Sequence, residues 1–237
     1  APNLMGNVCN WPKIREIADK YDLKVLEDSA DTLGAKIDGN SSGEYTDMSI
    51  TSFYGSHIIT CAGIGGMVCT NDVDIYEKLK ILRGWGRSSE LFAPDVNSDL
   101  DTNLRNRFDI SIDGISYDKK FIFEKEGFNF FAPEICAAFG LVQLKRFDQL
   151  FEKRKYNFNF LRDFIEKELS NYIITPKENY GVETNWLAYP IILKDISENI
   201  RTQLQIYLEK KNIQTRTIFS GNITKQPMMK DKVYNDN

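Results

Sequence analysis

The sequence predicts an α/β protein in which amphipathic helices alternate with short apolar strands. Three observations lead to this prediction. Apolar residues recur at helical spacing over residues 14–21, the mostly apolar segment at residues 23–26 has the length of a buried strand, and helical and strand-like segments keep alternating after it. This alternation is typical of layered α/β folds, in which ligands bind beyond the carboxyl ends of the strands.

Capping and turn residues place the first elements. Asn10 is a good helix N-cap and Pro12 suits the first turn, so a helix of about three turns is expected there. A polar connection with glycine and serine, residues 39–47, has the composition of a small hairpin. The other expected elements are a strand at Leu23–Leu26 that ends in Glu27-Asp28, strands at Met48–Tyr54 and Gly66–Thr70, and a helix capped by Asn71 or Asp72 that reaches about Leu82.

The second half of the chain resumes this pattern after a long irregular stretch. Residues 84–120 are polar and show little periodicity, which is typical of a functional or disordered loop, and order restarts at residues 121–123. The expected elements are then helices at about 134–145 and 148–169, a strand at 187–193, a helix from Ser197 to about Lys210, and a strand at 214–219. The tail has its own strand–helix–strand pattern, so we predict a domain boundary near residue 148.

Composition argues against several classes of protein. The formal net charge is −4 without a long Lys/Arg block, so neither a nucleic-acid partner nor a membrane partner is expected. The four cysteines form no C-x-x-C motif and the chain has one histidine, so no metal site is expected. Without a signal peptide or a membrane-spanning apolar run, we expect a cytoplasmic protein with reduced thiols. The missing initiator methionine predicts that the chain is a piece of a longer protein.

The single histidine, His57, lies where chemistry is expected. It follows a predicted strand and precedes a glycine-rich turn at residues 63–66. Imidazole is the side chain that both takes and gives a proton near neutral pH, so His57 is a candidate acid/base group. The alternative, an ordinary loop histidine, stays open on this evidence.

Two further residues end neighbouring predicted strands. Asp28 ends the first, and Ser52 near the end of the second is followed five residues later by the basic His57. A pyridoxal phosphate site needs a carboxylate to keep the pyridine nitrogen protonated and a hydroxyl to help hold the phosphate. Asp28 and Ser52 fit these roles, although strands commonly end in aspartate for structural reasons alone.

Four ordered strings carry a resemblance to a known family. They are Leu26–Ala35 (LEDSADTLGA), Ser52–Thr60 (SFYGSHIIT), Gly65–Val68 (GGMV) and Gly127–Asn129 (GFN). Together they resemble the DegT/DnrJ/EryC1/StrS sugar aminotransferase family over nearly the whole chain. The resemblance implies a pyridoxal phosphate-dependent transferase of fold type I, similar to aspartate aminotransferase. It further implies that residues 1–147 form the C-terminal part of the cofactor-binding large domain, that residues 148–237 form an incomplete small α+β domain, and that an N-terminal portion is missing.

Within this family, His57 occupies the position that normally carries the cofactor-binding lysine. That replacement resembles the 3-dehydratase branch, and so do Gly84–Arg87 (GWGR) and Phe219–Pro227 (FSGNITKQP). The CDP-sugar members also hold an iron–sulfur cluster, which needs cysteine ligands. This chain has Ser29 and Ala30 near the first ligand position and no cysteine between Cys69 and Cys136. The resemblance is therefore to the GDP-4-keto-6-deoxymannose 3-dehydratase type, without an iron–sulfur cluster.

The resemblance implies a function and a role for each site residue. The reaction would be C3 dehydration of a nucleotide-linked 4-keto-6-deoxyhexose in dideoxysugar or lipopolysaccharide biosynthesis, with pyridoxal or pyridoxamine 5′-phosphate as cofactor and an amino donor such as glutamate. His57 would be catalytic. The cofactor residues would be Asp28, Asp31, Ser52 and Asn129, with Asn129 reaching the cofactor of the partner in a homodimer, and the substrate residues would be Arg216 and Asn222.

Alternatives remain open at this point. The chain could instead belong to a nucleotide-sugar aminotransferase, or it could be a non-catalytic fragment that retains a dimer surface. Trp85 and Arg87 could pack within their own loop or contact the sugar nucleotide.

Overall fold

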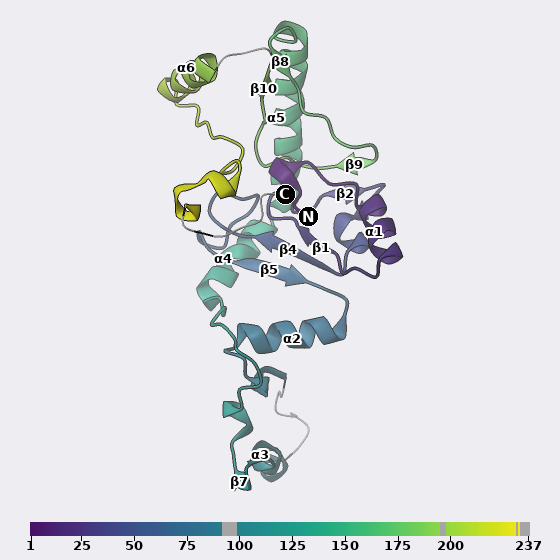
Figure 1. The fold of residues 1–237 in the computed structure, drawn as a ribbon, viewed down its shortest axis with the longest axis vertical. Helices are drawn as coiled ribbons and strands as arrows, with labels where there is room; N and C mark the ends of the chain where they lie inside the picture. Colours follow the sequence, from purple (N-terminus) through teal and green to yellow (C-terminus); the bar gives the residue numbers. More distant parts are fainter. Residues whose placement is uncertain (92–98, 195–197, 231, 233–237) are drawn as a thin grey trace.

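A computed structural model gives an elongated molecule with the principal sheet near its middle (Figure 1). It describes residues 1–91, 99–194, 198–230 and 232. The long helix α5 (Phe147–Glu168) lies toward one end, beside the paired strands β8 (Ile173–Ile174) and β10 (Ile192–Leu193). Helix α3 (Leu100–Phe108) lies at the other end. No helix among the described residues is long and apolar enough to cross a membrane.

The principal sheet has the order β1-β4-β5. Strand β1 (Leu26–Asp28) runs parallel to β4 (Met48–Ser52), and β5 (Gly66–Cys69) is antiparallel to β4. Asp28 pairs with Ile50 across β1 and β4. Because side chains alternate along a strand, Asp28 and Ser52 lie on one face of the sheet, whereas Glu27 and Ser49 lie on the other.

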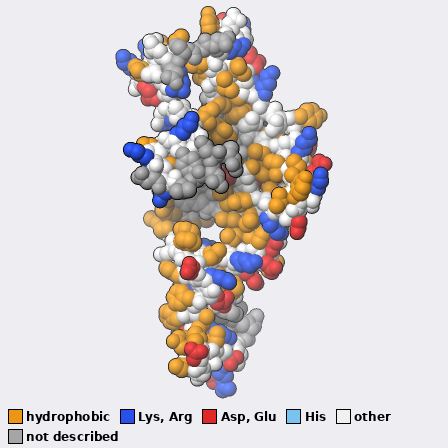
Figure 2. All heavy atoms as spheres, viewed as in Figure 1, with side chains coloured by type: hydrophobic (Ala, Val, Ile, Leu, Met, Phe, Trp, Pro, Cys, Tyr) orange, Lys and Arg blue, Asp and Glu red, His pale blue; other side chains and the backbone are white. Residues whose placement is uncertain are grey.

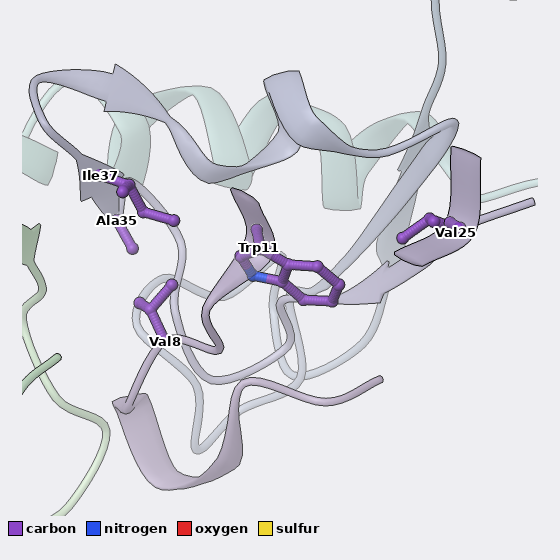
Figure 3. Packing of buried hydrophobic residues seen from close by; sticks show 6 residues of the cluster. Val8, Trp11, Val25, Ala35 and Ile37 are labelled. Atoms are coloured by element: carbon purple, nitrogen blue, oxygen red, sulfur yellow. The ribbon is translucent and has the colours of Figure 1, made fainter. Parts of the chain in front are cut away.

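A small core forms next to this sheet. Helix α1 (Trp11–Lys20) begins as predicted, with Asn10 as the N-cap that accepts a hydrogen bond from the Lys13 amide. Trp11 is fully buried, and its Nε1 donates to Asn3 Oδ1 (3.0 Å). Apolar side chains from α1 and the segments around it complete the core, namely Val8, Trp11, Ala18, Val25, Ala35 and Ile37 (Figure 3).

Part of the predicted second domain packs on the first. The hairpin expected at residues 39–47 lies earlier in the chain, as β2 (Lys36–Ile37) and β3 (Asn40–Ser41), and it gains a third strand from β9 (Val182–Glu183). Asn179 Nδ2 donates to the Val8 carbonyl (2.7 Å), and Thr184 Oγ1 donates to the Gly6 carbonyl (2.6 Å). The boundary near residue 148 stays a prediction, but residues 179–184 are bonded to the N-terminal part.

Most helices lie where the sequence places them. Besides α1 and α5 they are α2 (Val73–Arg83), with Asp72 as its N-cap, α4 (Glu134–Leu144) and α6 (Glu198–Lys210). The predicted first residue of α6, Ser197, lies outside the described residues. Short 3₁₀ turns connect other segments: Leu4–Gly6, Ser42–Tyr45, Ser88–Leu91, Lys119–Phe121, Ile223–Lys225 and Pro227–Met229.

Several predicted strands are wrong in extent. The strand at 23–26 is displaced to Leu26–Asp28, because the amide of Val25 is bound by the Asp47 carboxylate instead of a sheet partner. Of 187–193 only Ile192–Leu193 forms a strand, since Pro190 has no amide hydrogen to donate. Residues 214–219 form no strand and are mostly exposed, because no neighbouring strand pairs with them.

The irregular stretch at 84–120 holds more order than expected. It contains α3, capped by Asp99, and a hairpin formed by β6 (Ser111–Ile112) and β7 (Ile115–Ser116). The turn residues Asp113 and Gly114 both have positive φ, 53° and 81°. An Asp-Gly pair is a strong hairpin signal, so this hairpin was predictable from sequence and was missed.

Asp47 stabilises the segment that leads into β1. Its carboxylate accepts hydrogen bonds from the Val25 amide (2.7 Å), Arg15 Nη1 (2.9 Å) and Lys24 Nζ (3.1 Å). The Val25 amide, followed by the two cations, lowers the pKa of Asp47 to about 2. A depressed carboxylate pKa stabilises the fold at neutral pH, and that stabilisation is lost as the pH falls from the ordinary value toward the folded one.

Asp47→Asn should therefore lower the free energy of unfolding at pH 7 by about 1–2 kcal/mol. Urea denaturation would measure it, and the difference from wild type should shrink as the pH falls from about 4 to about 2. Asp19→Asn is the control, because Asp19 binds the same Arg15 but is 67% exposed, so its loss should cost less than about 0.5 kcal/mol. Equal costs for both variants would contradict this role for Asp47.

Candidate active site

Four of the predicted site residues belong to adjacent segments that follow β1 and β4. Asp28 is the last residue of β1 and Asp31 lies in the loop after it. Ser52 is the last residue of β4 and His57 lies in the turn that follows. Because β1 and β4 are parallel neighbours, their carboxyl ends lie at the same edge of the sheet.

Asp28 and Ser52 keep hydrogen-bonding capacity for a ligand. Asp28 Oδ1 accepts from the Ala30 amide (3.1 Å), which leaves Oδ2 without a hydrogen bond to any described residue. Ser52 Oγ accepts from the Tyr54 amide (3.2 Å), so its own hydroxyl hydrogen remains available. Both side chains are partly exposed on the same face of the sheet. Asp28 therefore offers a hydrogen-bond acceptor and Ser52 a hydrogen-bond donor on the same face of the sheet.

A closed loop holds His57 at this edge. The His57 amide donates to the Tyr54 carbonyl (3.0 Å), which forms a tight turn directly after β4. The Phe53 amide donates to the Gly65 carbonyl (2.9 Å), which closes the loop at its far end. Gly65 has a φ of 112°, a conformation that side-chain-bearing residues rarely adopt. The glycine-rich turn noted in the sequence thus fixes where the histidine stands.

His57 faces a buried carboxylate. Its Nδ1 lies 3.5 Å from Asp31 Oδ1, and the two side chains are 19% and 7% exposed. Asp31 Oδ2 accepts a hydrogen bond from the Met5 amide (3.0 Å). Burial raises the pKa of Asp31, and the Met5 amide and His57 oppose this rise only in part. An ionised Asp31 therefore costs folding free energy.

Sequence reasoning missed Tyr54. Its ring lies edge-on to the His57 ring, with centroids 6.4 Å apart, and 60% of the residue is exposed. Its place three residues before the histidine, at the end of a strand, was the available signal. An exposed aromatic ring beside the imidazole offers a surface for a planar ligand.

The residues present fit pyridoxal phosphate. Asp28 offers a free carboxylate oxygen for a ring N–H, and Ser52 offers a hydroxyl hydrogen for a phosphate oxygen. His57 Nδ1 is buried and makes no hydrogen bond within the described residues. Its imidazole can move a proton but lacks the primary amine needed to bind the cofactor covalently.

Asn129 lies beside the GWGR string. It forms a β-bridge with Gly84, and the neighbouring Phe128 carbonyl accepts from the Trp85 amide (2.8 Å). The backbones cross so closely that a Cβ on Gly127 would come within 2.0 Å of the Gly86 nitrogen. The GWGR string and the GFN motif therefore contact each other, and Asn129 is exposed at their junction.

The candidate residues of the loop at 84–87 and of the C-terminal segment contact neighbouring residues of their own segments or are exposed. The Arg87 guanidinium lies over the Trp85 ring at 4.4 Å, so the two residues contact each other within the loop, as in the first of the two alternatives. Asn222 Oδ1 caps the turn at Ile223–Lys225 by accepting from the Thr224 amide (3.0 Å). Arg216 is exposed in an irregular segment. Their predicted substrate contacts therefore stay predictions, as do the cofactor contacts of Asp31 and Asn129.

Thus the fold and the site define an aminotransferase-like α/β protein. The sequence model of the DegT/DnrJ/EryC1/StrS aminotransferase family matches residues 1–237, so the chain belongs to this family.

Individual relatives include both dehydratases and other enzymes. The chain is 32% identical over 232 residues to the lipopolysaccharide biosynthesis protein RfbH of Salmonella typhimurium, covering 97% of this chain and 52% of the relative. It is 30% identical over 228 residues to GDP-4-keto-6-deoxy-D-mannose 3-dehydratase of Yersinia pseudotuberculosis, covering 95% and 53%. A GDP-perosamine synthase of Caulobacter vibrioides is 31% identical over 218 residues, covering 92% and 50%. The chain thus spans about half the length of these relatives.

Solved structures agree with the fold. E. coli GDP-4-keto-6-deoxy-D-mannose-3-dehydratase with bound hydrated pyridoxal phosphate superposes with a TM-score of 0.77 at 28% identity, over 95% of this chain and 54% of that one. The sequence prediction of the family is therefore confirmed, and so is the α/β fold class.

The contact between Asp31 and His57 makes a test possible in the protein without ligand. In the neutral imidazole, a carboxylate at Nδ1 favours the tautomer with the proton on Nδ1. In Asp31→Asn, the side-chain oxygen can keep the Met5 amide while the new NH₂ faces Nδ1, which favours the proton on Nε2. Nitrogen NMR of the ring would report this change cleanly because His57 is the single histidine.

Asp31→Asn should also leave the fold as stable as wild type or more stable at neutral pH, since it removes a carboxylate whose ionisation burial opposes. Asp74→Asn, an exposed change in the first turn of α2, is the control that should leave the tautomer unchanged. An unaltered tautomer in Asp31→Asn would exclude the orienting role.

Proposed function

We propose that the whole protein catalyses C3 dehydration of a nucleotide-linked 4-keto-6-deoxyhexose with pyridoxal or pyridoxamine 5′-phosphate as cofactor. One observation carries this proposal: the turn after β4 places an imidazole, His57, beside the Asp31 carboxylate and at the same edge of the sheet as Asp28 and Ser52, whose free polar groups suit the cofactor. Family resemblance places a cofactor-binding lysine at this position in most members. A proton carrier without an amine favours elimination over transamination.

The relatives support the choice of substrate. A GDP-4-keto-6-deoxy-D-mannose 3-dehydratase and a dTDP-4-dehydro-2,6-dideoxy-D-glucose 3-dehydratase are both 30% identical to this chain. These names share a nucleotide-linked keto sugar and loss of the C3 oxygen. We infer the same class of substrate and reaction here, and a place in dideoxysugar or lipopolysaccharide biosynthesis.

The residues of this chain would divide the work. When bound, pyridoxamine phosphate supplies an amine for the sugar ketone and a ring that withdraws electrons. Asp28 would accept the ring N–H and hold the positive charge on the ring. Ser52 would donate its hydroxyl hydrogen to the phosphate. His57 would remove a proton from the carbon beside the cofactor amine and protonate the C3 oxygen as it leaves, and Asp31 would keep the imidazole oriented during both transfers.

A homodimer is part of the proposal. Large apolar side chains are exposed on several described segments, including Phe130 (68%), Ile135 (76%) and Leu141 (63%), and Figure 2 shows hydrophobic patches on the viewed face. Extended apolar surface of this kind commonly marks a protein interface. The exposed Asn129 lies in the same part of the sequence, which suits the expected contact with the partner's cofactor.

An aminotransferase is the second candidate. It is favoured by the similarity to GDP-perosamine synthase. This relative is 31% identical to the chain, and the GDP-4-keto-6-deoxy-D-mannose 3-dehydratase is 30% identical. The lysine position discriminates the two, because transamination as usually run needs a primary amine there.

The decisive experiment supplies full-length protein with pyridoxal phosphate, glutamate and GDP-4-keto-6-deoxymannose. Release of ammonia with a 3-deoxy sugar supports dehydration. An amino sugar as the product would overturn it in favour of the aminotransferase.

Variants at His57 test the assigned proton carrier. His57→Asn should lower turnover by at least about 100-fold, because general acid–base catalysis contributes that much, while cofactor binding stays nearly unchanged. His57→Lys should instead trap the cofactor covalently after borohydride reduction, seen as a mass increase of the chain. Turnover that survives in His57→Asn would show that another group moves the proton.

A further inference from the structure

A second polar site lies on the face of the sheet opposite Asp28 and Ser52. A cavity of about 340 Å³ opens there between β1, β4 and the turn at Ser42–Tyr45. Hydroxyl and carboxylate side chains dominate its lining, and no lysine or arginine contributes to it. The cavity therefore suits a ligand that is coordinated by oxygen atoms.

Glu27 is the unusual member of this lining. It is 1% exposed, and its Oε1 accepts hydrogen bonds from Asn3 Nδ2 (2.6 Å), Ser42 Oγ (2.6 Å) and Ser29 Oγ. Its Oε2 is buried and accepts none from the described residues. A buried carboxylate oxygen without a donor or counterion is costly, so an occupant for this position is needed.

Gly43 leaves room for that occupant. A Cβ on Gly43 would stand 3.4 Å from Ser49 Oγ and 3.7 Å from Glu27 Oε2, so both oxygens face the space that its missing side chain leaves. Gly43 does not have the positive φ that would itself require glycine. Because Gly43 has no side chain, the unpartnered Oε2 of Glu27 and the hydroxyl of Ser49 face the same space.

We propose that this space binds a monovalent alkali cation, Na⁺ or K⁺, through Glu27 Oε2 and Ser49 Oγ. One carboxylate and hydroxyl oxygens suit a singly charged hard ion. Calcium sites typically use several carboxylates, and the described residues hold no cluster of three acidic, histidine or cysteine side chains that could bind a metal ion. The rest of the cavity has room for the waters that complete the ion's shell.

The site has a structural consequence. Glu27 precedes Asp28 in β1, and its donors Asn3, Ser29 and Ser42 come from three separate segments. A cation on Oε2 would neutralise the buried charge that these donors surround. Its binding would therefore stabilise the strand that presents Asp28 to the other face.

Thermal unfolding of the 237-residue chain tests the proposal. Wild type would be compared in equal concentrations of KCl, NaCl and tetramethylammonium chloride, which match ionic strength but differ in whether the cation fits. At about ten times its Kd, the fitting ion should raise the Tm by roughly 3 °C over tetramethylammonium. ²³Na NMR of the same samples should show line broadening from bound sodium that potassium competes away.

Gly43→Ala is the discriminating variant. Its added methyl makes only close or ordinary contacts with Ser49 and Glu27, so the protein should fold, but the methyl takes the ion's place. The Tm difference between the salts and the sodium broadening should both disappear. Glu44→Gln is the matched control, because it removes an exposed carboxylate from the same cavity lining and should keep both effects.

Equal Tm values for wild type in the three salts, without sodium broadening, would overturn the proposal. Salt effects that persist in Gly43→Ala would overturn this location. Neither readout involves turnover, so the outcome is independent of the proposed dehydratase activity.

Discussion

The hydrogen-bonded network around Asn3 and Glu27 is the constraint on which this structure depends. Asn3 is 1% exposed; its Nδ2 donates to Glu27, Ser29 and Thr32, and its Oδ1 accepts from the Cys9 amide and Trp11 Nε1. It therefore joins the N-terminal segment, α1 and β1 in one buried unit. Since Glu27 is held on the inner face, its neighbour Asp28 must point to the opposite face, where Ser52 also lies. The candidate active site is in this sense a consequence of the core.

Two buried carboxylates carry different costs in this arrangement. Glu27 is compensated on one oxygen by three donors. Asp31 has one amide donor and faces His57, and burial raises its pKa. A strained electrostatic position of this kind is uncommon where only stability matters, and it commonly accompanies function. The two carboxylates thus differ in how many donors the fold provides for them, three for Glu27 Oε1 and one amide for Asp31.

Much of the fold could be predicted from local sequence, and the failures share a cause. The caps Asn10 and Asp72 marked real helix starts, because capping depends on residues within one turn. The strand at 23–26 was displaced because Asp47, more than twenty residues away, binds the Val25 amide. The strand at 214–219 failed because extended residues need a partner strand, which no local pattern reveals. The hairpin at Asp113-Gly114 was local and was overlooked.

The sequence by itself determined the family, every α-helix of the described residues except α3, and the four candidate residues near the strand ends, because motifs and capping rules depend on residue order. It also showed that a histidine stands where most family members have a lysine. Only the tertiary structure decided that His57 faces Asp31 at 3.5 Å, that Tyr54 lies beside it, and that Glu27 keeps an unpartnered oxygen. These facts depend on how segments far apart in the chain pack together, and on which groups that packing removes from water.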